Sequence, residues 1–66
     1  MKPEDVYLPQ VLFEMQRQGN YVRVIAVDPR SNTEITMVGD RNAGDEHLKR
    51  LAIRKLKYVI AKRAAR

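Results

Sequence analysis

Residues able to act as nucleophile or base are few in this chain, and they stand apart. His47 is the only histidine, Ser31 is the only serine, and there is no cysteine. A hydroxyl nucleophile needs a base within hydrogen-bond reach, and neither residue has an identifiable partner in the sequence. The lack of cysteine also excludes disulfides and thiolate metal sites. We therefore predict no catalytic residue and a protein that is not an enzyme.

The segment GDRNAGDEHL, residues 39–48, begins like a calcium-binding loop because Asp40 and Asn42 lie two positions apart. In such a loop the required glycine would fall on Asp45 and the bidentate acid on Leu51, so the pattern fails. Capping of a helix by Asn42 accounts for these residues better. A phosphate-binding Gly-Lys-Ser/Thr motif is also missing. We expect neither a metal nor a cofactor.

Positive charge is the remaining chemical feature, and it is confined to one segment. Residues 1–44 hold five basic and six acidic residues, whereas residues 45–66 hold eight basic and two acidic residues. A localised basic excess of this kind favours the phosphates of nucleic acid or an acidic protein as the partner. The candidate binding residues are Lys49, Arg50, Arg54, Lys57 and Lys62.

The basic segment has the pattern of an amphipathic helix over residues 43–62. Asn42 is the predicted N-cap, and Asp45 and Glu46 lie where the helix dipole favours acids. The cations Arg50, Arg54 and Lys57 fall opposite the apolar stripe, while residues 63–66 form a basic tail expected to fray. The apolar stripe consists of Leu48, Leu51, Ala52, Leu56, Val59 and Ile60.

Residues 10–39 have the alternation and the turn residues of a three-stranded meander. Gly19-Asn20 is a two-residue hairpin loop whose glycine supplies the positive φ of a type II′ turn, and a type I′ turn remains an alternative. In the second hairpin, DPRSNTE, Asn32 tolerates the left-handed conformation. The predicted strands are residues 10–17, 21–28 and 33–39, preceded by an N-terminal arm of residues 1–9.

The register of these strands follows from the two turns. Pairing across them brings apolar residues together on one face, which must then be covered. The pairs are Phe13 with Ala26, Met15 with Val24, Ala26 with Ile35, and Val24 with Met37. The sequence thus predicts an α+β fold, a three-stranded antiparallel β-meander with one C-terminal amphipathic helix packed across one face (β-β-β-α), as a single domain over residues 1–66.

Three segments, QGNYVRV, VDPRSNTE and LAIRKLKYVI, resemble a family of small uncharacterised alphaproteobacterial proteins built on a domain of unknown function. The likeness covers about residues 12–62. It implies a stand-alone module without a known activity or site. Asn32 departs from the family pattern, which has glycine there, and asparagine adopts the same conformation at modest cost.

The outward face of the predicted sheet is the other candidate surface. It carries more branched aliphatic residues than solvent requires, which is typical of a partner surface or of a symmetric dimer that stacks two sheets. A solvated face rich in β-forming residues is the plainer interpretation. The residues concerned are Leu12, Tyr21, Arg23, Ile25, Val27 and Val38.

Two functions therefore remain open. The first is weak, sequence-tolerant binding of nucleic acid through the basic helix face. The second is an accessory module for protein interaction, which uses either the outer sheet face or the basic helix. The acidic residues near the N-terminus and the short apolar runs argue against a signal peptide and a membrane span, so we expect a cytoplasmic protein without membrane contact.

Overall fold

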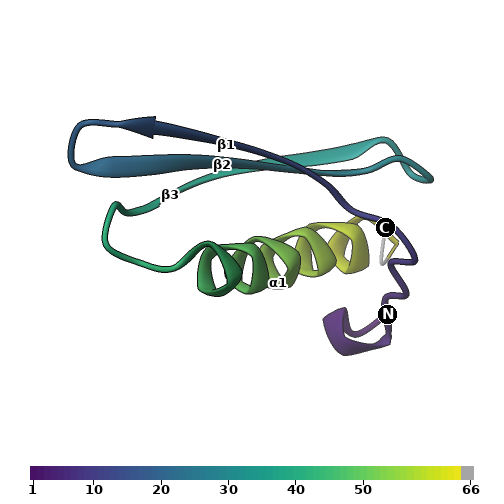
Figure 1. The fold of residues 1–66 in the computed structure, drawn as a ribbon. Coiled ribbons are helices and arrows are strands. Elements are labelled where there is room, and N and C mark those ends of the chain that lie inside the picture. Colours follow the sequence, from purple (N-terminus) through teal and green to yellow (C-terminus); the bar gives the residue numbers. More distant parts are fainter. Residues whose placement is uncertain (65–66) are drawn as a thin grey trace.

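The computed structural model of the chain describes residues 1–64. A 3-10 helix, η1 (Pro3–Asp5), precedes the strands β1 (Leu12–Gln18), β2 (Tyr21–Asp28) and β3 (Thr33–Asp40), and the helix α1 (Asp45–Ala64) follows them. The strands form one antiparallel sheet in the order β1-β2-β3, and α1 lies along one of its faces (Figure 1). The predicted β-β-β-α architecture is confirmed.

The register of the sheet is the one that the turn residues predict. Phe13 pairs with Ala26 and Met15 with Val24, and on the other side of β2 Ala26 pairs with Ile35. The first hairpin has a positive φ of 60° at Gly19, and the positive-φ residues do not include Asn20, which is the pattern of a type II′ turn.

The second hairpin turns through Asn32, whose φ of 56° lies in the left-handed region, as predicted. Asp28, at the end of β2, accepts the Arg30 amide on Oδ1 at 3.1 Å and the Ser31 hydroxyl on Oδ2 at 2.7 Å. These bonds form an Asx-type turn that holds the loop shape. Asp28 and Thr33 are the two buried polar residues of the described chain.

The hydrophobic core lies between the sheet and α1. Every second residue of β2 and β3 points toward the helix, and every third or fourth residue of α1 points toward the sheet. These two sets of side chains pack against each other. Leu48 packs against Gly39 of β3, where a Cβ atom would collide with the Leu48 side chain. The buried members of this core are Val22, Val24, Ala26, Ile35, Leu48, Ala52 and Leu56.

The ends of α1 differ from those expected. The helix begins at Asp45, and the Gly44 carbonyl accepts the first intrahelical bond from Leu48 at 3.0 Å, so Gly44 and not Asn42 occupies the N-cap position. The amide of Asn42 instead donates to Asp40 Oδ1 at 2.7 Å, which turns the chain before the helix.

At its other end α1 continues to Ala64. Arg63 and Ala64 are thus helical, whereas the sequence placed them in a frayed tail. Arg63 is held because its guanidinium reaches Thr33 across the end of the sheet. The rest of the predicted tail, residues 65–66, lies outside the described residues.

The N-terminal arm packs on the helix through η1. Figure 1 shows η1 beside α1 and away from the sheet, so the helix lies between the sheet and the arm. Pro3 begins the short helix, a position where the missing amide costs nothing. Val6 and Ala61 are both buried although neither belongs to the core between sheet and helix. The arm therefore covers part of α1 outside the predicted apolar stripe.

Candidate nucleic-acid interface

Three cations share the outward side of α1. Arg50, Arg54 and Lys57 follow one another at spacings of four and three residues, so they project from one helix face. Arg50 and Arg54 are exposed, and Lys57 is half-buried. In the part of the chain that the structure describes, the ion pairs are Arg17 with Asp45 and Lys49 with Glu46. These three side chains are thus free of carboxylate partners within residues 1–64.

The other two predicted cations lie on the flanks of this face. Lys49 Nζ is 3.9 Å from Glu46 Oε1 and 5.6 Å from the ring centroid of Phe13, so it is directed toward β1. Lys62 Nζ is 6.0 Å from the ring centroid of Tyr58. The structure therefore brings three of the five predicted residues together and places two at the sides.

A groove lies between η1 and the outward face of α1. Its volume is about 660 Å³, and it is open to solvent. Arg54 and Lys57 line it together with Tyr58, which is 56% exposed. Glu4 of the arm contributes a carboxylate to the same groove. The remaining lining residues are Pro3, Leu51 and Lys55.

Lys55 has a structural partner at the edge of the sheet. Its ammonium donates to the Thr36 carbonyl oxygen at 3.0 Å, from α1 to the edge strand β3. Edge strands leave backbone groups without a strand partner, and a lysine there satisfies one of them and discourages pairing with another chain. Lys55 thus reaches from α1 to the edge of the sheet.

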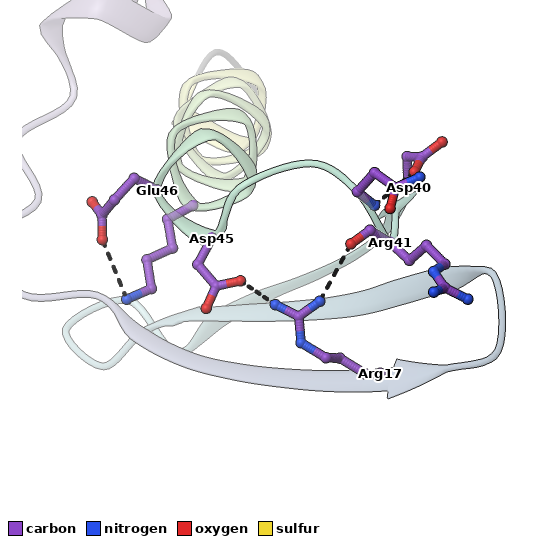
Figure 2. Close-up of polar contacts among 7 residues, drawn as sticks. Arg17, Asp40, Arg41, Asp45 and Glu46 are labelled. Carbon is purple, nitrogen blue, oxygen red and sulfur yellow. Dashed lines mark hydrogen bonds and ion pairs between the residues drawn. The ribbon is translucent and has the colours of Figure 1, made fainter.

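A polar cluster fixes the start of α1, as Figure 2 shows. The guanidinium of Arg17 on β1 binds the Asp45 carboxylate and donates to the Arg41 carbonyl at 3.5 Å. Asp45 therefore joins the first turn of the helix to the sheet, in addition to its favourable place at the positive end of the helix dipole. Within residues 1–64, no group of three potential ligands is arranged to hold a metal ion.

The outer face of the sheet is uncovered. Leu12 is 48% exposed, Val38 is 62% exposed, and Ile25 and Val27 are half-buried. Leu12 pairs with Val27, so their side chains are neighbours on this face. The face also carries the exposed Arg23 beside Val38, and Tyr21, whose hydroxyl donates to Gln18 Oε1 at 2.7 Å.

Sequence reasoning missed the arm and the aromatic residue beside it. Residues 1–9 show neither a strand nor a helix period, so their docking site was not predictable from pattern alone. A weak signal exists in α1, where Tyr58 and Ala61 fall among the cations and outside the apolar stripe. A partner for that side of the helix could have been inferred from them.

Comparison with protein families gives one match. The family described as domain of unknown function (DUF6898) matches residues 8–63. This range includes all three strands and nearly all of α1. Neither the curated proteins nor the solved structures contain a match to this chain. No helix within residues 1–64 has the length and apolarity required to cross a membrane.

Proposed function

We propose that this chain, which belongs to the DUF6898 family of domains of unknown function, binds nucleic acid through the outward face of α1. The observation that carries the proposal is the set of three cations, Arg50, Arg54 and Lys57, which have no carboxylate partner within the described residues. The proposal includes a cytoplasmic location and a bacterial, alphaproteobacterial origin.

The spacing of the cations suits a phosphate backbone. From Arg50 to Lys57 the helix rises about 10 Å at about 1.5 Å per residue. One strand of a duplex advances about 3.4 Å along the axis for each phosphate, so about three phosphates lie alongside this stretch. Arginine can also bind a phosphate through two parallel hydrogen bonds, which adds orientation to the charge attraction.

The affinity should be low and nearly independent of sequence. Contacts to phosphate carry no direct information about the bases. Glu4 of the arm lies in the same groove as Arg54 and opposes an incoming anion. Binding should therefore be micromolar or weaker at physiological salt.

The test is fluorescence anisotropy with a labelled duplex of about 20 base pairs at about 50 mM salt. Replacing Arg50, Arg54 and Lys57 together with glutamine should abolish most of the binding. The matched control replaces Arg23, Arg30 and Arg41 with glutamine, because these exposed arginines do not belong to α1 and the loss of net charge is the same. Equal effects of the two triple changes, or no binding by the parent, would contradict the proposal.

A second candidate function is protein interaction through the outer sheet face, with a homodimer as its simplest form. The exposed Leu12 beside Val27, together with Ile25, favours it, since a chain this small gains much from burying such a face. Ile25→Lys should then convert a dimer to a folded monomer in light scattering. A parent that is monomeric at high concentration excludes the homodimer.

A further inference from the structure

We infer that the groove between η1 and α1 accepts one nucleotide of a single strand, with its base stacked on Tyr58 and its phosphate bound by Arg54 and Lys57. The inference rests on the proposed nucleic-acid binding and specifies its ligand. A single strand presents both an accessible base and a phosphate, whereas the bases of a duplex are already stacked on each other.

Tyr58 has the exposure that a stacking platform requires. The residue is 56% exposed, although the nearby Leu56 and Val59 turn toward the sheet. It also borders two hollows, the groove of about 660 Å³ and a smaller one of about 230 Å³ lined by Met1, Pro3, Ala61 and Lys62. An aromatic side chain left open on the basic side of a helix can stack any base, because every base has a π face.

Two cations lie beside this ring in the same groove. Arg54 precedes Tyr58 by four residues, so the two project from the same side of α1, and Lys57 lines the same groove. Lys62 places a further positive charge 6.0 Å from the ring centroid. Lys55 also lines the groove, but its ammonium donates to the Thr36 carbonyl. Arg54 and Lys57 are the lining cations without a hydrogen bond or ion pair among residues 1–64.

The dimensions and chemistry of the groove agree with one nucleotide. A volume of about 660 Å³ lies within the range of about 300 to 1,000 Å³ that is usual for small-ligand sites. Leu51 and Pro3 supply apolar surface beside the ring. Glu4 is the unfavourable element, because its carboxylate repels the phosphate, and Glu4→Gln should strengthen the binding of single strand and duplex alike.

The test compares Tyr58→Leu with Tyr58→Phe on the full chain, after circular dichroism confirms that both fold. The probes are labelled 12-residue oligo-dT, 12-residue oligo-U and the DNA duplex of about 20 base pairs, at about 50 mM salt. Removing one stacking ring should weaken single-strand binding about 5- to 150-fold and leave duplex binding unchanged. Tyr58→Phe keeps the ring and should bind as the parent does. The tighter of oligo-dT and oligo-U identifies DNA or RNA as the source of the strand.

Equal single-strand affinity of Tyr58→Leu and the parent overturns the inference. If the triple change at Arg50, Arg54 and Lys57 still weakens binding in that case, the proposed function stands and only the stacking site fails. An equal loss on duplex and single strand also overturns the inference, since it shows a structural or electrostatic effect. The absence of binding to every probe removes the proposed function together with this inference.

Discussion

Arg63, in the last turn of α1, donates a hydrogen bond of 3.1 Å from Nη1 to the hydroxyl of Thr33 at the start of β3. The Thr33 hydroxyl lies 2.7 Å from that of Ser31, which donates to Asp28 Oδ2 at 2.7 Å. Arginine and carboxylate fix the direction of this chain, because the first can only donate and the second, when ionised, can only accept. Thr33 therefore donates to Ser31. The chain joins the end of the helix to the second hairpin.

Thr33→Val should destabilise the fold because it removes the hydroxyl at the centre of this chain. Thr33 is 1% exposed, and valine would leave Ser31 without a donor and Arg63 without its acceptor. We expect a loss of about 1 to 3 kcal/mol in the free energy of unfolding, measured by urea denaturation. Thr36→Val is the matched control on the exposed face and should change stability by less than about 0.5 kcal/mol. Equal effects would show that the hydroxyl chain contributes nothing.

Asp28 should make stability fall at low pH. The Ser31 hydroxyl is the main cause that holds the pKa of this carboxyl below its ordinary value, and the Arg30 amide contributes in the same direction while burial opposes it. A lowered folded-state pKa means stability that is present above the unfolded value of about 3.9 and is lost as pH falls through the folded value.

Asp28→Asn removes this titration. We expect the difference in urea midpoint between parent and variant to shrink when the pH is lowered from about 7 to about 2, because only the parent loses this contribution. The comparison at each pH cancels the other carboxyl groups, which both chains share. A difference that is independent of pH would mean that Asp28 has the same pKa in the folded and unfolded chains.

Gly39→Ala should destabilise the domain because Leu48 occupies the space that the new methyl group needs. Leu48 is 1% exposed and cannot swing into solvent without leaving the core. We expect a cost of about 1 to 3 kcal/mol. Leu48→Val shortens that side chain, so Gly39→Ala should cost less in its background. Equal costs of Gly39→Ala in the parent and in the Leu48→Val background would contradict the collision.

The sheet was predictable in detail because two local signals agreed on its register. The turn residues Gly19 and Asn32 set the pairing of the strands. Any other register would turn the apolar residues away from the core. The close approach of Leu48 to Gly39 was not predictable, since a glycine in a strand has many explanations. It depends on where the helix axis crosses β3, which no local pattern records.

The candidate site was predictable only in part, for a similar reason. Helical periodicity places Arg50, Arg54 and Lys57 together, and this needs no tertiary information. The groove beside them depends on the docking of η1 on α1, and the sequence of η1 has no repeat that would predict it. The N-cap was also misplaced, because Asn42 and Gly44 are both acceptable caps and only the chain path decides between them.

Asn32→Gly should stabilise the second hairpin. Asn32 has a φ of 56°, a conformation that costs a residue with a side chain more than it costs glycine. The greater freedom of glycine in the unfolded chain offsets part of the gain, so we expect a few tenths to about 1 kcal/mol in thermal or urea unfolding. Asn32→Ala should destabilise the fold, because the left-handed conformation costs alanine more than it costs asparagine. A loss of stability with glycine would contradict the role given to the positive φ.

The salt dependence of the affinity for DNA should show how many phosphates α1 contacts. Each phosphate neutralised on duplex DNA releases counterions and contributes about −0.9 to the slope of log affinity against log salt. Arg50, Arg54 and Lys57 therefore predict a slope of about −3, and the flanking Lys49 and Lys62 would extend it to about −5 only if they turn from Phe13 and Tyr58 to the ligand.

Anisotropy titrations between about 50 and 200 mM salt measure this slope. Replacing the three central cations with glutamine should bring it close to zero, whereas Lys49→Gln and Lys62→Gln together should change it by less than one unit. The same loss should appear for duplexes of different sequence, because phosphates are common to all of them. A slope that survives the triple change would place the contacts on another surface, and a slope near zero in the parent would contradict phosphate binding by these cations.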